Sequence, residues 1–271
     1  MSIYRIVNLN FDFNLYKECL EGQWEKFEIN TSDMQYCDSM IMGSIVGGNY
    51  IIINRDIKFL HLNTLTGAEN IINANNYILI ANKDYSKAFL QCSDKYTNGL
   101  LLGYYFYCHA VRQSMIQFHS SLIRVGGNGL MFLGPSGIGK TTQAELWNQY
   151  RDALIINGDV VFVQETSDDF LGWGTPWHGS SPYCENTSVP VKALIVLKQA
   201  PENSIRELTG FEKVTAVSNN VFYPRWLEGG MELCLETLNH LLSALPVYEL
   251  SCRPDEEAVR LTEEAVFGGS V

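Results

Sequence analysis

A glycine-rich segment in the middle of the chain has the residue types and spacing of a phosphate-binding loop. Glycines allow a backbone to turn so that successive amide N–H groups point toward phosphate oxygens. The lysine of such a loop reaches the β- and γ-phosphates, and the hydroxyl that follows it ligates Mg²⁺. The segment matches the whole pattern G-x-x-x-x-G-K-[ST] and consists of Gly134, Pro135, Ser136, Gly137, Ile138, Gly139, Lys140 and Thr141, with Thr142 next. It predicts binding of a nucleoside triphosphate, with Lys140 on the phosphates and Thr141 on the metal.

The flanking residues fit the strand–loop–helix arrangement that this motif requires. The apolar run 130–133 precedes the loop as a strand, and residues 141–147 continue it as a helix. The N-terminal end of a helix carries a partial positive charge, which adds to the attraction for phosphate. The local sequence therefore supports nucleotide binding independently of the motif.

A second acidic position follows the next expected strand. Residues 153–157 predict a strand, and Gly158 and Asp159 come directly after it. An aspartate at this place can hold Mg²⁺ or its water, or accept a proton from an attacking hydroxyl. The alternative is that Asp159 is an ordinary residue of an Asn-Gly-Asp turn.

Together with an upstream histidine, these features resemble the catalytic domain of the HPr kinase/phosphorylase family, which is related in fold to ATP-dependent phosphoenolpyruvate carboxykinase. His119 lies fifteen residues before Gly134, and the loop and the early acid follow it. The resemblance covers about residues 115–200. It implies a mixed sheet and a place for His119 near the transferred phosphoryl group and the acid. Taken alone, a histidine at a helix–strand junction would be interpreted as structural.

The chain departs from that family at the acids. The family has two consecutive acids, whereas here Gly158 stands at the first position and Asp159 at the second. Either Asp159 takes both roles, or another residue serves as the general base. Residues 174–179 and 189–194 are similar to HPr-kinase-like proteins encoded with ribosomally made, modified peptides, which include the lasso-peptide tailoring kinases. That resemblance implies phosphorylation of a serine in a precursor peptide.

Three further residues are candidates for contacts with substrate or phosphate. His178 follows Trp177 in a glycine-containing loop and is either a base or substrate contact or a packed loop histidine. Arg225 is either a phosphate clamp, because guanidinium groups match phosphate oxygens, or a surface residue. Lys192 lies inside an apolar strand and either faces the nucleotide or has no part in the site.

The composition restricts the classes of partner that we expect the protein to bind. Acidic residues outnumber basic ones by 30 to 19, for a formal net charge of −11. Such a charge repels a nucleic-acid backbone, so we expect no nucleic-acid partner. No stretch has the length of a membrane span or the pattern of a signal peptide. The seven cysteines form no CxxC pair, so we expect reduced thiols in a cytoplasmic protein without a membrane partner.

We expect an α/β fold in two domains. Residues 1–97 predict a small, mainly β domain with strands at Tyr4–Leu9, Tyr50–Ile53, Lys58–Leu62 and Tyr77–Ala81. Residues 98–271 are expected to form an HPr kinase-like P-loop domain that starts with a helix at 98–118. Further expected strands are 120–125, 130–133, 153–157, 160–164, 191–197 and 247–250, and further helices are 228–243 and 254–266.

The sequence therefore predicts an ATP- and Mg²⁺-dependent kinase that phosphorylates a serine hydroxyl of a peptide or protein, with a ribosomal precursor peptide as the candidate acceptor. Asp159, His119 and Lys140 are the expected catalytic residues, and Thr141 and Asp159 the expected metal ligands. The alternatives are a kinase for a small metabolite and a nucleotide-binding regulatory module with little catalysis. Assembly as a homo-oligomer is left open.

Overall fold

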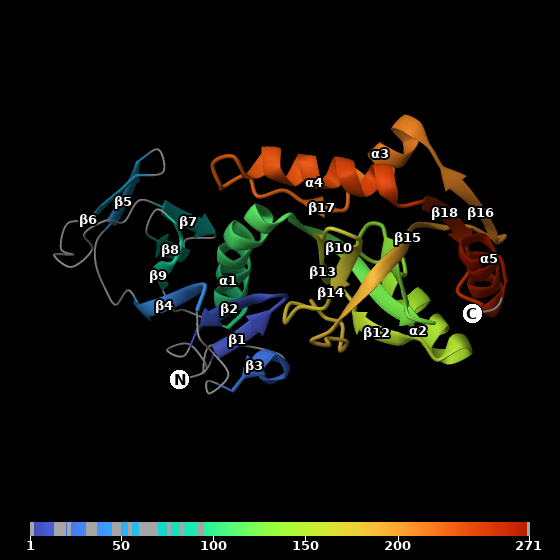
Figure 1. Cartoon of the computed structure of the whole chain (residues 1–271), viewed down its shortest axis with the longest axis horizontal. Helices are drawn as coiled ribbons and strands as arrows, with labels where there is room; N and C mark the ends of the chain where they lie inside the picture. Colours follow the sequence, from blue (N-terminus) through green and yellow to red (C-terminus); the bar gives the residue numbers. More distant parts are fainter. Residues whose placement is uncertain are drawn as a thin grey trace. The chain divides into compact units, whose positions relative to one another are not determined.

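The computed structural model describes residues 3–13, 20, 23–30, 37–44, 50–53, 56–59, 70–74, 77–81, 84–90 and 95–269. The chain divides into two compact units, Met1–His109 and Ala110–Val271 (Figure 1). The expected class, α/β with a mainly β N-terminal part and a large mixed sheet, is confirmed. None of the helices in the described part of the chain combines the length and apolar composition that a membrane span requires.

The N-terminal unit is built from short strands and one long helix, α1 (Lys95–Ala110). Seven strands form one sheet in the order β3-β1-β2-β4-β9-β8-β7, and β5 pairs with β6. The strands and the 3-10 helix are β1 (Ile3–Ile6), β2 (Leu9–Asp12), η2 (Trp24–Phe27), β3 (Glu28–Ile29), β4 (Ser39–Ser44), β5 (Tyr50–Ile53), β6 (Asp56–Phe59), β7 (Asn70–Ala74), β8 (Tyr77–Ala81) and β9 (Lys87–Leu90).

Two expected N-terminal strands are confirmed at their predicted bounds, as β5 and β8. The expected strand Tyr4–Leu9 is instead a hairpin of β1 and β2, because Val7 has a φ of 59° and turns the chain. The expected strand Lys58–Leu62 overlaps the end of β6, and its last residues lie outside the described part.

Helix α1 belongs to the N-terminal unit, so the structural division falls after it, not before it as the expected boundary at residues 97 and 98 had it. The reason is its packing. The ring of Phe106 lies 5.5 Å from that of Phe11 in β2, measured between centroids. The hydroxyl of Tyr105 donates to the carbonyl oxygen of Tyr85, and His109 Nε2 lies 2.9 Å from the same oxygen. These contacts hold the apolar face of α1 against the N-terminal strands.

The C-terminal unit starts with the 3-10 helix η4 (Val111–Gln113). Its remaining elements are β10 (Met115–Val125), β11 (Asn128–Leu133), α2 (Lys140–Arg151), β12 (Leu154–Asn157), β13 (Val160–Glu165), β14 (Phe170–Trp173), β15 (Ser188–Gln199), β16 (Ser204–Leu208), α3 (Gly210–Ser218), β17 (Val221–Phe222), α4 (Gly230–Ala244), β18 (Val247–Cys252) and α5 (Glu256–Phe267).

Two long strands organise the sheet of this unit. The first half of β10 pairs with β13, and its second half pairs with β11 and β12. Strand β15 pairs with β14 near its start and runs parallel to β11 and β18 further along. The pairings β10–β13–β14–β15–β11–β10 thus form a closed ring, and the parallel pairs make the sheet mixed. Because β10 contacts strands from distant parts of the sequence, it brings their ends together.

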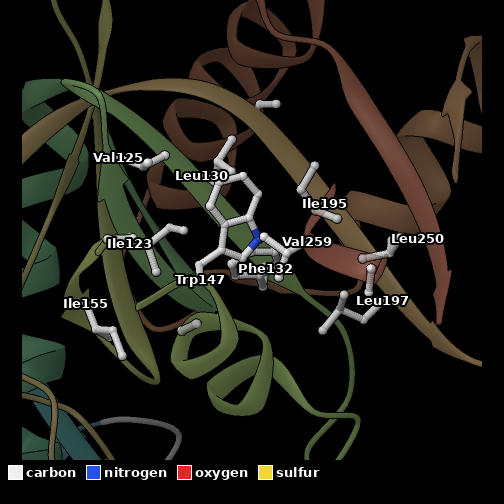
Figure 2. Packing of buried hydrophobic residues seen from close by; sticks show 14 residues of the cluster. Ile123, Val125, Leu130, Phe132, Trp147, Ile155, Ile195, Leu197, Leu250 and Val259 are labelled. Atoms are coloured by element: carbon white, nitrogen blue, oxygen red, sulfur yellow. The ribbon is translucent and has the colours of Figure 1, made fainter. Parts of the chain in front are cut away.

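A large hydrophobic cluster joins α2 and α5 to this sheet (Figure 2). Trp147 of α2 is fully buried among Leu130, Phe132 and Ile195 from the strands and Val259 from α5. Removing a residue of this size from a core costs about 3–5 kcal/mol, so the cluster fixes α2 firmly. A partly buried ion pair adds to it, since Arg151 Nη2 lies 2.7 Å from Oε2 of the buried Glu263. The helix that begins at the phosphate loop is therefore anchored at its far end.

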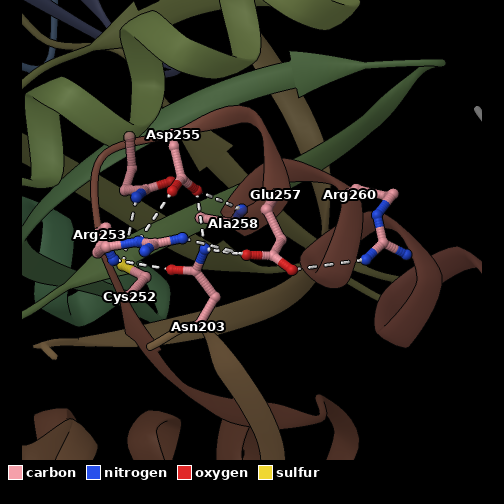
Figure 3. Close-up of polar contacts among 8 residues, drawn as sticks. Asn203, Cys252, Arg253, Asp255, Glu257, Ala258 and Arg260 are labelled. Carbon is pink, nitrogen blue, oxygen red and sulfur yellow. Dashed lines mark hydrogen bonds and ion pairs between the residues drawn. The ribbon is translucent and has the colours of Figure 1, made fainter. Parts of the chain in front are cut away.

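The closing helix begins two residues later than expected. Its N-cap is Asp255, whose carboxylate accepts a hydrogen bond from the backbone N–H of Ala258 (3.2 Å). The same carboxylate binds Asn203 and Arg253, so the cap belongs to a surface network of polar side chains (Figure 3). Asp, Asn, Ser and Thr are preferred N-caps because their oxygens satisfy free N–H groups of the first turn.

The expected helix at 98–118 is wrong in its second half. The helix ends at Ala110, and β10 begins at Met115. Ser114 between them has a φ of 53°, a left-handed conformation that ends the helical path. Strands β14, β16 and β17 and helix α3 were not expected. The other expected elements of this unit are confirmed, most with bounds shifted by a residue or two.

Candidate active site

The phosphate loop connects the end of β11 to the start of α2. Gly137 and Gly139 have φ values of 78° and 114°, in the left-handed region that residues with side chains rarely adopt. Gly139 is also the N-cap of α2 and has no side chain to accept from the first N–H groups of the helix. Those groups remain available to an anion. The backbone thus has the form of an anion site at a helix N-terminus.

Lys140 is the most enclosed polar group of the loop, with only 6% of its surface exposed. Its Nζ donates to the carbonyl oxygens of Gly134 (3.0 Å) and Pro135 (3.3 Å) and lies 3.0 Å from His119 Nε2. Burial lowers the pKa of the Lys140 ammonium below its usual value, and the carboxylate of Asp159 opposes that shift. A lysine that is already desolvated and held by weak carbonyl contacts is well placed to move onto phosphate oxygens.

His119 connects Lys140 to the acid. Its Nε2 lies 3.1 Å from Oδ1 of Asp159, and the side chains of both residues are partly exposed. The structure therefore brings the three expected catalytic residues into one chain of contacts. A single Nε2 cannot donate to the carboxylate and accept from the ammonium at once. His119 donates to the carboxylate if Nε2 carries the proton, and it accepts from the Lys140 ammonium if Nε2 does not. If Lys140 moved toward a bound nucleotide, Nε2 would keep only its contact with Asp159.

The turn that carries Asp159 is fixed by its neighbour Asn157. The amide nitrogen of this buried side chain donates to the carbonyl oxygens of Thr175 (3.0 Å) and Trp177 (3.1 Å). Its Oδ1 accepts from the backbone N–H groups of Asp159 (2.9 Å) and Val160 (3.0 Å). These hydrogen bonds hold Asp159 and Val160, the first residue of β13, in one conformation.

Replacing Asn157 by alanine is expected to destabilise the protein by about 2–4 kcal/mol, because one buried and three partly buried backbone groups lose a partner. The free energy of unfolding in urea measures this effect. Asn157→Asp should also destabilise, since a carboxylate cannot donate to the carbonyls of Thr175 and Trp177. Asn239→Ala, at an exposed position of α4, is the control and should change the value by less than about 0.5 kcal/mol. An unchanged free energy in Asn157→Ala would show that this amide does not hold the turn.

The loop between β14 and β15 closes over this turn. Gly179 has a φ of 56°, and a β-carbon placed on it would lie 2.4 Å from Oδ2 of Asp159, so a residue with a side chain does not fit. His178 uses its Nδ1 on the carbonyl oxygen of Ser181, within the same loop. The loop is tied to α2 because the hydroxyl of Tyr183 donates to Glu145 (3.1 Å). The expected candidate His178 therefore lies one residue from the backbone that covers Asp159, and its chemical role stays a prediction.

There is no room for a side chain at residue 158, where the family that the sequence resembles has its first acid. A β-carbon on Gly158 would lie 1.9 Å from the hydroxyl oxygen of Ser181. Its backbone is fully used, since its carbonyl accepts from Ser121 Oγ and its N–H donates to Tyr183 O. An acidic side chain at 158 is thus excluded while Ser181 keeps its place.

The oxygen donors near the loop fit Mg²⁺. Thr141 stands at the start of α2 and faces the β12–β13 turn, since its Oγ1 lies 3.8 Å from a β-carbon placed on Gly158. A hydroxyl and a carboxylate are the hard donors that Mg²⁺ prefers, and this ion usually adds nucleotide phosphates and water to one or two protein groups. Among the described residues no cluster of three or more His, Cys, Asp or Glu side chains forms a metal site of its own. Thr141 and Asp159 would hold an ion that enters with the nucleotide.

Two of the expected contact residues, Lys192 and Arg225, do not contact the phosphate loop in the described part of the chain. Lys192 is exposed on β15 between Val191 and Ala193, which pair with Gly129 and Leu130 at the start of β11. The phosphate loop follows the other end of β11. Lys192 therefore does not face the nucleotide, and that expectation is wrong. Arg225 is exposed in the segment between β17 and α4, and no contact in the described part of the chain joins its side chain to the loop. Its expected role as a phosphate clamp stays a prediction.

Sequence reasoning missed Asn220. Its Oδ1 accepts from the backbone N–H of Gly134 (2.8 Å), and its carbonyl oxygen accepts from that of His119 (2.8 Å). One residue thus positions both the first glycine of the phosphate loop and the histidine. Phe222, two residues further along β17, places its ring 6.2 Å from that of His119. No motif marks these residues, because their role follows from the pairing of β17 with β10.

No family model and no curated protein matches this chain. Among solved structures it is similar to the Hpr(Ser) kinase/phosphatase from Coxiella burnetii, with 13% sequence identity and a TM-score of 0.32. That similarity covers 56% of this chain and 93% of the other. At this level it assigns neither a substrate nor a reaction to the present protein.

Proposed function

We propose that this chain is an ATP- and Mg²⁺-dependent kinase that transfers the γ-phosphoryl group to a serine hydroxyl of a peptide or protein. The observation that carries the proposal is the contact chain from Lys140 through His119 to Asp159 at the phosphate loop. A phosphate-binding loop with its lysine, and a carboxylate linked to that lysine through one histidine, are groups that phosphoryl transfer requires.

Each residue has a defined part in the proposed reaction. The amides of the loop and of the first turn of α2 hold the phosphates, and Lys140 moves from the carbonyls of Gly134 and Pro135 onto the β- and γ-oxygens. Thr141 would ligate Mg²⁺, and the ion would supply positive charge to the phosphates. The serine oxygen forms the new bond to the γ-phosphorus while the bond to the β–γ bridging oxygen breaks, and the electron pair leaves with ADP.

The proton of the serine needs an acceptor, and Asp159 is the proposed one. Its Oδ1 faces Nε2 of His119, which can donate to the carboxylate and stabilise its charge before transfer. The cover formed by Gly179 limits the space around the other oxygen, so an acceptor hydroxyl would enter beside His119. Asp159 is partly exposed, which keeps a path for a substrate open.

The net charge and the sequence resemblance favour a peptide as the phosphate acceptor. The net charge of −11 disfavours nucleic acid, and the sequence resembles peptide-tailoring kinases, so a serine of a ribosomal precursor peptide is the proposed target. One observation favours a second candidate function. Gly158 stands where the HPr kinase family, which the sequence resembles, has its first acid, and loss of that acid is expected in a nucleotide-binding regulatory module with little catalysis.

The test uses the full chain with ATP, Mg²⁺ and a panel of serine-containing peptides, including any precursor peptide encoded beside it. Mass spectrometry follows the added phosphate, and free serine and a sugar are included as small acceptors. Phosphate on a peptide serine is the expected result. Phosphate on the small acceptors alone would replace this proposal by a small-metabolite kinase. Tight ATP binding without transfer to any acceptor would favour the regulatory module.

A further inference from the structure

The hydroxyl of Ser181 fills the space that a side chain at residue 158 would need. A β-carbon on Gly158 would lie 1.9 Å from Ser181 Oγ and 2.4 Å from Ser181 Cβ. Bonded residues aside, such distances do not occur between real atoms, so one position can carry a side chain only if the other gives way. The chain thus places a neutral hydroxyl where an acid at residue 158 would project.

The same space borders the metal-binding hydroxyl of the phosphate loop. The point next to Ser181 Oγ lies 3.8 Å from Oγ1 of Thr141. Ser181 is 8% exposed, and its backbone N–H donates to the carbonyl of His178 (3.1 Å). Its Oγ accepts a long hydrogen bond (3.3 Å) from the N–H of Tyr183, and a hydroxyl oxygen has a second lone pair and a proton to offer. The hydroxyl oxygens of Ser181 and Thr141 therefore both lie within 3.8 Å of one point beside Gly158, at the start of α2.

We propose that Ser181 is a second hydroxyl ligand, beside Thr141, of the Mg²⁺ ion that enters with ATP. The inference rests on the proposed function, since it requires a metal–nucleotide complex in the loop. Mg²⁺ is small and binds oxygen donors, and it keeps water and phosphate oxygens in most of its positions. Neutral ligands add no charge, so the ion depends on the phosphates for its affinity. In this arrangement Ser181 takes the place of Asp159 as the second protein ligand of the ion, and Asp159 keeps its contact with His119 and accepts the proton of the acceptor.

The test is the effect of Mg²⁺ on binding of a non-hydrolysable ATP analogue, measured by calorimetry without any acceptor. Mg²⁺ should increase the affinity of the wild type for the analogue. In Ser181→Ala the Mg²⁺ concentration that gives half of this increase is expected to be about 10-fold higher, as after loss of a supporting group at a metal site. Binding of the analogue without Mg²⁺ should not change. Ser180→Ala, at the exposed neighbouring position, is the matched control and should behave as the wild type.

Two further variants separate a ligand from a residue that only fills space. Ser181→Cys keeps the shape but offers soft sulfur, so it should respond poorly to Mg²⁺ and recover with Cd²⁺. The wild type is measured with Cd²⁺ as well, because the chain has seven other cysteines. Gly158→Ala should displace the hydroxyl and reproduce the weak Mg²⁺ response of Ser181→Ala.

The outcomes distinguish this inference from the function on which it rests. A normal Mg²⁺ response in Ser181→Ala and Ser181→Cys would overturn the role of Ser181 and leave the kinase proposal standing. Nucleotide binding that is indifferent to Mg²⁺ in the wild type would overturn both. Recovery of Ser181→Cys by Cd²⁺, beyond any effect on the wild type, would establish direct contact with the metal.

Discussion

Replacing Lys140 by alanine is expected to abolish phosphoryl transfer, with a loss of at least about 10²–10³-fold in turnover, while the protein stays folded. The Lys140 ammonium is the cation proposed to hold the transferred phosphoryl group, and removing one electrostatic donor from a transition state has an effect of this size. Its present partners are carbonyls of its own loop and His119, so the core around Trp147 keeps its contacts. ATP consumption and phosphopeptide formation measure the loss, with circular dichroism to follow the fold.

Lys140→Met is the control for packing, because it keeps most of the buried stem and removes only the charge. It should lose as much activity as Lys140→Ala and should be at least as stable. Lys213→Ala, a substitution on α3 away from the loop, should retain turnover. Undiminished turnover in a folded Lys140→Ala protein would remove the kinase proposal altogether.

Asp159→Asn is expected to lower turnover by about 10²–10⁴-fold, the usual contribution of a general base. Nucleotide affinity should fall far less. An amide has the shape of the carboxylate but cannot accept the serine proton, and the backbone of residue 159 remains bonded to Asn157 and Ser120. The rate in a single turnover and the dissociation constant of the ATP analogue are the two quantities to compare.

Asp168→Asn makes the same chemical change at an exposed turn position and should leave both quantities as in the wild type. Asp159→Glu is expected to be impaired too, because Gly179 leaves little room for a longer side chain. If nucleotide affinity falls in Asp159→Asn and the single-turnover rate does not, Asp159 is a binding or structural residue and not the proton acceptor.

The fold was largely predictable where local pattern and burial agree. The strand–loop–helix unit at the phosphate loop, the hairpin turn at Gly126 and Gly127, and α4 and α5 all carry such patterns. The run from Met115 to Phe118 does not, since a short apolar segment fits a buried helix and a buried strand equally well. Pairing with β13 decides for the strand, and that pairing is invisible in the local sequence.

The site was predictable as far as chemistry follows from residue type. Lys140, Thr141 and Asp159 are candidates because their motif or position is informative. Asn220 is not indicated by the sequence, because an asparagine between a helix and a two-residue strand has no pattern of its own. The proposed role of Ser181 is likewise invisible in the sequence, since it depends on the missing side chain of Gly158, which only the three-dimensional arrangement reveals.

The dependence of the site on β10 has a consequence for folding. Strand β10 pairs with β11 across a tight turn, but it pairs with β17 only after a long stretch of chain. Asn220, which binds Gly134, follows it by 86 residues. Contacts between distant residues form slowly, because closing a long loop costs entropy before any contact is gained. During synthesis the phosphate loop and Asp159 leave the ribosome well before β17. A nascent chain therefore carries the whole phosphate-loop motif without the amide that holds Gly134, and under the proposed function ordered binding of ATP would wait for the finished C-terminal unit.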